Sequence, residues 1–113
     1  MLTAKDEAIM MLKDSLELLS DVSRWAKESF ALNAKGDETF PRFDNAVKWN
    51  PRGAITKFSM DYEDNYGDQP YDIAMSALQS VVPDVLYVWE ESEYTTHSDV
   101  INSFNAAIVL LSS

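Results

Sequence analysis

The sequence predicts a mainly α-helical protein, a single small domain over residues 1–113 with room for one short β-hairpin. Both ends of the chain carry a helix-capping pattern followed by apolar residues at helical spacing. The middle of the chain has shorter apolar runs that proline and glycine residues interrupt. A chain of 113 residues with 46% hydrophobic residues suits one core rather than two, and its lack of cysteine means that the core forms without disulfides.

The first helix is expected from Ala4 to Leu19. Thr3 and Asp6 form a capping-box pattern in which aspartate takes the place of the usual longer acid. The apolar residues that follow recur at steps of three and four, which places them on one helical face: Ile9, Leu12, Leu16 and Leu19. Ser20, Asp21 and Ser23 are expected to end this helix and start a second turn, which brings Trp25 close to the core.

The next part of the chain has a looser pattern. Residues 29–34 and 39–40 are expected to form a short hairpin, with a loop as the alternative. Asp44 is a good N-cap for a segment with Ala46, Val47 and Trp49, but Asn50-Pro51 interrupts this segment early. A helix over residues 52–59 follows, with Pro51 at its first position.

The remaining segments alternate between loop and helix. Residues 61–69, rich in acids and tyrosines, are expected to form a surface loop. Pro70 opens a helix that ends before Pro83. The apolar run of residues 85–89 fits a strand or a buried helical turn, and its periodicity does not separate the two.

The last helix has the clearest pattern. Thr96 and Asp99 form a second capping-box pattern, and the apolar stripe behind it contains Val100, Ile101, Phe104, Ala107, Ile108 and Leu111. Residues 106–111 are apolar on every side. Such a helix either is central to the core or covers a partner, and a homodimer through this C-terminal helix is one such partner.

The net charge of the chain lies entirely in its second half. The formal net charge is -10, and all 9 basic residues precede Phe58. The segment from Phe58 onward has 10 of the 19 acidic residues and no Lys or Arg. This excess of carboxylates argues against direct nucleic-acid binding, which needs cations to displace counterions from phosphate. It indicates either a solvated acidic face or a surface that docks on a basic protein.

The patterns of catalysis and metal binding are absent from the sequence. Its single histidine, His97, is expected to be structural, because neighbouring helical residues cannot form an ordered Ser-His-Asp relay. Residues 61–68 have acids in a register that does not fit a calcium-binding loop, and the three glycines are too far apart for a phosphate cradle. We therefore expect no catalytic residue, no metal and no cofactor.

The candidate partner-binding residues are acids of the second half and tyrosines that stand among them. Such side chains attract Arg and Lys of a partner by ion pairs and cation–π contacts. The expected set is Asp61, Tyr62, Glu63, Asp64, Tyr66, Asp68, Glu90, Glu91 and Glu93. Trp25, Trp49 and Trp89 are expected to be core anchors, with a Trp-lined ligand pocket as the alternative.

Several motifs resemble a small uncharacterised family found in actinobacteria and their phages. The resemblance spans about residues 10–110 and rests on Trp25, on residues 34–36, on the run from Asp44 to Trp49 with Gly53-Ala54-Ile55, on Trp89, and on Thr96-His97 three residues before Val100. Glu90-Glu91 stands where the family has Asn-Asp. The resemblance implies a mainly helical domain and no particular activity.

These observations favour a small acidic protein that binds rather than catalyses. The leading hypothesis is a cytoplasmic inhibitor or adaptor, without membrane contact, that occupies a basic, nucleic-acid-binding surface of a partner protein. Phage-encoded inhibitors of host defence nucleases, such as anti-CRISPR proteins that imitate DNA, work in this way. The alternatives are a small-ligand-binding helical domain with a Trp-lined pocket and a hydrolase that uses the acids beside Trp89.

Overall fold

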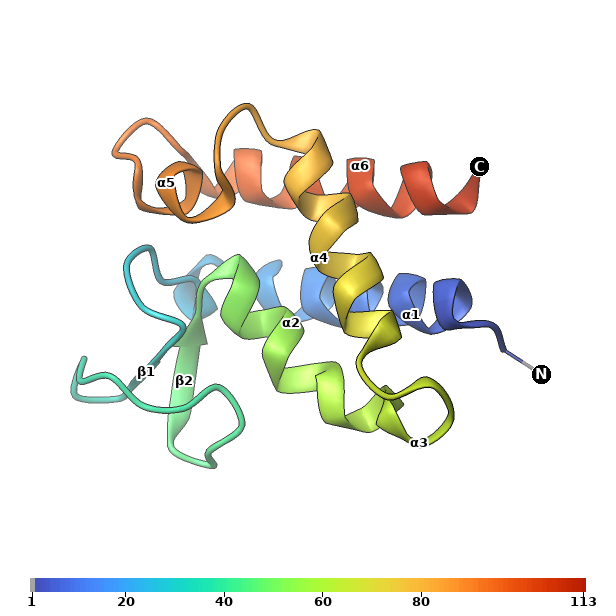
Figure 1. Cartoon of the computed structure of the whole chain (residues 1–113). Coiled ribbons are helices and arrows are strands. Elements are labelled where there is room, and N and C mark those ends of the chain that lie inside the picture. The colour runs from blue at the N-terminus through green and yellow to red at the C-terminus, as the bar shows by residue number, and fades with distance from the viewer. Residues whose placement is uncertain (1) are drawn as a thin grey trace.

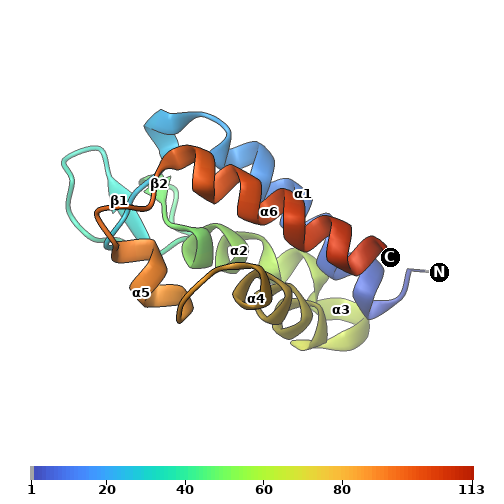
Figure 2. The same cartoon turned by 90° about the horizontal axis from the view of Figure 1, so that it is seen from above.

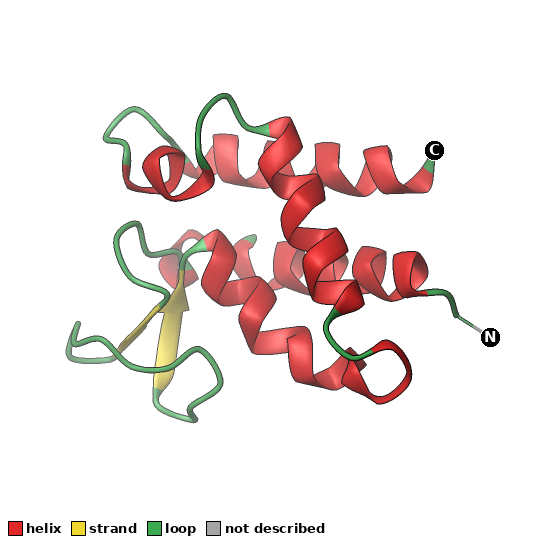
Figure 3. Ribbon diagram, in the orientation of Figure 1, coloured by secondary structure: helices red, strands yellow, loops and turns green. Residues whose placement is uncertain are grey.

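The computed structural model describes residues 2–113, and for Glu63 and Asp64 it describes the backbone alone. The elements in chain order are α1 (Ala4–Leu19), η1 (Val22–Arg24), β1 (Ala31–Asn33), β2 (Ala46–Trp49), α2 (Pro51–Ser59), η2 (Met60–Tyr62), α3 (Glu63–Tyr66), α4 (Gln69–Val81), α5 (Leu86–Glu91) and α6 (His97–Ser112). The predicted fold class, mainly α with one short hairpin in the described part, is confirmed (Figure 3).

Four helices build the body of the molecule in two layers. Helices α1 and α6 lie side by side and run antiparallel, so that the N- and C-termini lie at the same end (Figures 1 and 2). Helix α4 crosses in front of both α1 and α6, and α2 lies in front of α1 (Figure 1). The hairpin and α5 lie at the end of the molecule opposite the termini.

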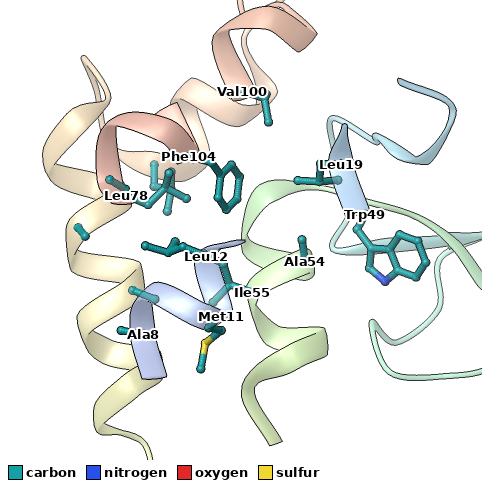
Figure 4. Close-up of a cluster of buried hydrophobic side chains, with 14 of the residues drawn as sticks. Ala8, Met11, Leu12, Leu19, Trp49, Ala54, Ile55, Leu78, Val100 and Phe104 are labelled. Atoms are coloured by element: carbon teal, nitrogen blue, oxygen red, sulfur yellow. The ribbon is translucent and has the colours of Figure 1, made fainter. Parts of the chain in front are cut away.

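The core lies where these four helices meet. Figure 4 shows Phe104 of α6 among side chains of α1, α2 and α4, and all of these residues are removed from solvent. The largest fully buried apolar side chains are Phe104, Met11, Leu12, Leu19, Ile55, Leu78 and Val100. Burial of each such side chain contributes about 1.5–3 kcal/mol to folding, so this cluster holds the two layers together.

The capping predictions agree with the structure at both terminal helices. The Thr3 hydroxyl accepts a hydrogen bond from the Asp6 N–H at 3.0 Å, and the Asp6 carboxylate accepts one from the Thr3 N–H at 3.0 Å. Thr96 and Asp99 make the same reciprocal pair at the start of α6. The predicted bounds of α1 and the predicted helices starting at Pro51 and Pro70 are confirmed to within one or two residues.

The hairpin forms with a different partner strand from the one predicted. Strand β1 pairs with β2 in antiparallel register, with Ala31 opposite Trp49 and Leu32 opposite Lys48. Residue 38 makes only an isolated bridge to Leu32, and the segment after Asp44 is a strand rather than a capped helical turn. The segment Ala46–Trp49 is a strand because its backbone pairs with β1. Its two end residues, Ala46 and Trp49, are buried, and the two residues between them are exposed.

Two further segments are helical. The run 85–89, for which strand and helix remained open, is helical from Leu86 onward as part of α5. The buried residues of α5, Leu86, Trp89 and Glu90, have helical spacing. The expected surface loop over residues 61–69 instead contains η2 and α3. The hydroxyl of Tyr66 donates to the Leu2 carbonyl at 2.6 Å and fixes this segment against the start of α1.

Candidate functional site

The acidic residues predicted to face a partner divide into two separate groups. Asp61 and Asp68 are exposed around α3, whereas Glu91 and Glu93 are exposed at α5 and the loop after it. Helices α3 and α5 lie at opposite ends of the molecule in both views (Figures 1 and 2). The acids of the second half therefore do not gather into one continuous negative patch.

Glu90 is buried, so its prediction as a partner-binding surface residue is wrong. Its side chain is buried, with Oε1 2.5 Å from Nε of Arg52 and Oε2 accepting from the Arg52 backbone N–H at 2.9 Å. Burial raises the pKa of Glu90, and the contacts with Arg52 oppose that effect. The helical spacing of α5 turns Glu90 inward together with Leu86 and Trp89.

The two predicted tyrosines at the α3 end serve the fold. The half-buried Tyr62 donates from its hydroxyl to a carboxylate oxygen of Asp14 at 2.7 Å, and Tyr66 is the residue that bonds the Leu2 carbonyl. Burial and the neighbouring Asp14 carboxylate raise the pKa of Tyr62. The side chains of Glu63 and Asp64, also predicted to bind, lie outside the described residues.

The other acidic end contains an open groove of about 620 Å³. It lies between the α4–α5 connection, α5 and the N-terminal half of α6. Every lining residue belongs to residues 81–106, inside the half of the chain without Lys or Arg. The lining consists of Val81, Val82, Pro83, Asp84, Val88, Trp89, Ser92, Tyr94, Thr95, Asp99, Asn102, Ser103 and Ala106.

Local hydrogen bonds fix the walls of this groove. The amide of Gln79 donates to the Asp84 carbonyl at 2.8 Å and accepts from the Leu86 N–H at 2.8 Å, which holds the α4–α5 connection against α4. The Thr95 hydroxyl donates to the Trp89 carbonyl at 2.6 Å and ties the loop after α5 back onto that helix. The groove is therefore shaped by the chain itself before any partner arrives.

The groove combines an apolar floor with acidic walls. Trp89 is 7% exposed, while Tyr94, at 83%, stands at the edge. The Asp84 and Asp99 carboxylates each accept a backbone N–H at a helix start, from Val85 and Thr96, and neither is in an ion pair. The negative charge of the walls is therefore available to a cation that enters.

The only ion pair among the described residues joins Arg52 to Glu90, away from the groove lining. One cation of the N-terminal half reaches the groove region: the ammonium of Lys27 donates to the Ser92 carbonyl at 2.7 Å. Glu91 and Glu93 are exposed on either side of Ser92. The acidic side chains at this end thus outnumber the cation that approaches them.

The three tryptophans do not share a pocket. Trp49 is buried and donates from its indole N–H to the Pro41 carbonyl at 2.9 Å, and Trp25 packs on His97 with ring centroids 5.6 Å apart. Trp89 lines the groove and neither of the others does. The core-anchor prediction is confirmed for Trp49 and Trp89, each less than a tenth exposed.

Sequence reasoning missed Asp84, Asp99 and Asn102 as groove residues. A signal for the first two was present, because both belong to the cation-free segment. Asp99 was interpreted as a capping residue, and nothing in the sequence placed it near residue 84. The two residues line one groove only because α6 packs against α4.

The described residues hold no group of three or more His, Cys, Asp or Glu side chains suited to a metal ion. Among the described residues, no helix combines the length and the hydropathy needed to span a bilayer.

The fold and the groove together define a small, acidic α-helical domain with an anionic recess at its α5 end. A family model described as a family of unknown function (DUF6197) matches residues 3–110, and the chain belongs to this family. The resemblance to an uncharacterised family, noted from the motifs of the sequence, is thereby confirmed. No curated protein and no solved structure matches the chain.

Proposed function

We propose that this protein acts by binding rather than by catalysis and that its groove receives a basic segment of a partner protein. One observation carries the proposal: the entire lining of the groove comes from residues 81–106, which contain acids and no Lys or Arg. A recess of this kind repels an acidic ligand and attracts a cationic one over roughly a Debye length, about 8 Å at physiological salt.

The chemistry of the groove suits arginine or lysine side chains. Their aliphatic stems can lie on Val81, Val88 and Trp89, while the charged heads reach Asp84 and Asp99. Tyr94 at the edge offers a further aromatic face for a cation. Exposed Glu91 and Glu93 beside the groove would raise the rate of encounter with a positive surface.

In its fuller form the proposal assigns the basic segment to a nucleic-acid-binding surface of the partner, which this protein would occupy as an inhibitor or adaptor in the cytoplasm. The support is the segregation of all net charge into one half of the chain. Because the acids lie at two ends of the molecule, we propose contact through the groove rather than imitation of a long phosphate array.

The test uses a synthetic peptide with alternating lysine and leucine residues, and its affinity is measured by calorimetry over a salt series. The charge reversal Glu93→Lys, beside the groove between the lining residues Ser92 and Tyr94, is expected to weaken binding at least about tenfold, or about 1.4 kcal/mol. The matched reversal Asp61→Lys, at the α3 end, is expected to change binding less than about twofold. Both side chains are exposed, so both variants should fold.

Two results would overturn this assignment. A larger loss of affinity for Asp61→Lys than for Glu93→Lys would move the site to the α3 end. Binding that neither reversal nor added salt weakens would remove electrostatic docking altogether. For the fuller form, heparin should release the captured natural partner, and a partner that heparin does not displace would contradict a nucleic-acid-binding surface.

A second candidate function uses the same groove for a small ligand. Its volume of about 620 Å³ lies within the usual range of small-molecule sites, and Trp89 supplies an aromatic floor. This form of the ligand hypothesis involves one tryptophan instead of three. An uncharged aromatic ligand whose binding is unaffected by salt would favour it over a basic protein segment.

A further inference from the structure

A second recess, of about 470 Å³, lies between α4, α5 and the first turn of α2 (Figure 2). It shares no lining residue with the groove. Among the described residues that line it, Arg52 is the one cation and none is Asp or Glu. We call it the Arg52 recess. Its charge is therefore opposite to that of the groove.

Contacts within the fold hold the Arg52 guanidinium and leave one of its edges open. Nε donates to Oε1 of Glu90 at 2.5 Å, and the guanidinium carbon lies 4.6 Å from the centroid of the Phe30 ring. In the described part of the chain, neither terminal nitrogen, Nη1 or Nη2, donates a hydrogen bond. No buried side-chain nitrogen in that part lacks a partner, so both terminal nitrogens reach solvent. The side chain as a whole is 25% exposed.

This open edge of the guanidinium matches a carboxylate. Nη1 and Nη2 can each donate to one carboxylate oxygen, a paired contact that arginine makes and lysine does not. Because Glu90 and Phe30 already fix the guanidinium, little side-chain freedom is lost when an acid binds. A phosphate group carries nearly two negative charges, and the net charge of -10 repels it more strongly than a singly charged carboxylate.

The rest of the lining suits an apolar body. Met75 of α4 and Leu86 and Tyr87 of α5 contribute apolar surface to the recess. Tyr87 is 52% exposed, so its ring is accessible to a ligand. The volume lies within the usual range of small-molecule sites. We propose that the Arg52 recess binds a small monocarboxylic acid, with the carboxylate on Arg52 and the apolar body on Met75, Leu86 and Tyr87.

This site goes beyond the proposed function of the groove and does not depend on it. The groove attracts cations and the Arg52 recess attracts an anion, and the two have separate linings. The charge reversal Glu93→Lys, which should weaken peptide binding at the groove, should change acid binding in the recess less than about twofold. Either site can therefore fail while the other stands.

NMR titration of the ¹⁵N-labelled protein with phenylacetate tests the proposal and locates the site. For a ligand of about ten heavy atoms, we expect a Kd of about 1 mM. Shift changes are expected at the backbone amides of Arg52, Ser76, Leu86 and Tyr87. The matched probe phenylacetamide has the same ring but no charge, and it should bind at least about tenfold more weakly. A salt concentration of about 150 mM screens the net charge of the protein.

Two variants test the role of the charge. Ser76→Glu adds an acid to the recess at an exposed position of α4 and should raise the Kd at least about tenfold. The control Ser112→Glu adds the same charge at an exposed position of α6 that does not line the recess, and it should change the Kd less than about twofold. Arg52→Lys keeps a cation beside Glu90 but removes the two-nitrogen edge, and it should weaken binding by about tenfold. Circular dichroism checks that all three variants fold.

Several outcomes would overturn the proposal. Phenylacetamide that binds as tightly as phenylacetate would show that Arg52 does not recognise the carboxylate. Shift changes confined to the groove lining would place the acid at the wrong site. The absence of shift changes up to about 10 mM phenylacetate would remove the site altogether. A folded Ser76→Glu variant that binds phenylacetate like the wild type would exclude the recess.

Discussion

Glu90 joins two parts of the chain through a single carboxylate. One oxygen pairs with the Arg52 guanidinium and the other accepts the Arg52 N–H in the first turn of α2, so α5 is fixed to the start of α2. Arg52 is itself held against the Phe30 ring, 4.6 Å from its centroid. A buried pair of this kind contributes little net stability, but removal of one partner is costly, because it leaves the other without its contacts.

The pH dependence of stability should reveal the environment of Glu90. Because burial raises its pKa above the ordinary value of 4.5, the folded state binds the Glu90 proton more tightly than the unfolded chain does. The resulting contribution to stability is complete below the unfolded pKa and is lost as the pH rises through the folded pKa. The free energy of unfolding of the wild type minus that of Glu90→Gln should therefore decrease as the pH rises from about 4 to about 7.

Urea unfolding at a series of pH values measures this difference in unfolding free energy. Glu17→Gln, at an exposed position of α1, serves as the control, and its difference from the wild type should stay within about 0.5 kcal/mol across the series. If the difference in unfolding free energy between the wild type and Glu90→Gln increased with pH, the attraction of Glu90 to Arg52 would outweigh the cost of its burial.

The sequence predicted which residues cap helices more readily than it predicted which charged residues are buried. Thr3 and Thr96 were recognised because a capping box is a contact between residues three apart. Glu90 was assigned to the surface because its partner lies 38 positions away. Nothing local distinguishes its buried carboxylate from the exposed ones of Glu91 and Glu93 on either side.

At the scale of elements, the contact between α2 and the hairpin depends on Gly53. A Cβ at this position would lie 1.8 Å from the backbone carbonyl oxygen of Phe30, where no flexible side chain can move aside. The Gly53 N–H also donates a hydrogen bond to the side-chain oxygen of Asn50, the N-cap of α2, at 2.7 Å. The first turn of α2 can therefore approach the strand region only because this residue is glycine.

Gly53→Ala is expected to destabilise the protein by about 2–3 kcal/mol, the cost of overpacking a tight contact. In an isolated helix the same substitution would stabilise the helix by about 1 kcal/mol. The sign of the change in unfolding free energy therefore shows whether packing or helix propensity dominates. Denaturant unfolding measures it. Gly67→Ala is the matched control, because that glycine has a φ of +57° and open space around it, and the cost there is conformational alone, about 1 kcal/mol. An equal loss at the two positions would contradict the packing argument.

The elements were predictable wherever their signals were local. Helices α1, α2, α4 and α6 begin at a cap or a proline and carry apolar faces, and each was expected close to its observed bounds. The strand partner of residues 31–33 was not predicted, because Ala46–Trp49 is too short for a clear period and pairs across a loop of twelve residues. For residues 85–89, too, the sequence did not separate strand from helix, because the outcome depends on how Leu86 and Trp89 pack in the core.

At the scale of the whole molecule, the cation-free half gives the groove its charge and also stores repulsion. The sequence predicted the charge segregation but not its geometry, since α3 and α5 are brought to opposite ends only by the packing of α4 between them. Carboxylates held near one another without cations destabilise a fold. Their retention at the groove is reasonable if binding requires them, which is a trade-off between stability and function.

This trade-off gives a final prediction. Neutralising the two exposed acids beside the groove, in the double variant Glu91→Gln and Glu93→Gln, should raise the melting temperature at low salt because it removes repulsion. The same variant should lose about tenfold in affinity for the lysine–leucine peptide, since its encounter with the cationic peptide is less strongly steered. Differential scanning calorimetry and isothermal titration measure the two effects.

The matched control is the double variant Glu17→Gln and Glu28→Gln, which neutralises two exposed acids in the half of the chain where charges balance. Because acids and bases are equal in number in that half of the chain, neutralising these two acids should neither stabilise the fold nor change peptide binding. The stability gained at the groove should also disappear near 1 M salt, where the Debye length falls to about 3 Å. A groove variant that became less stable while keeping its affinity would show that Glu91 and Glu93 serve the fold rather than a partner.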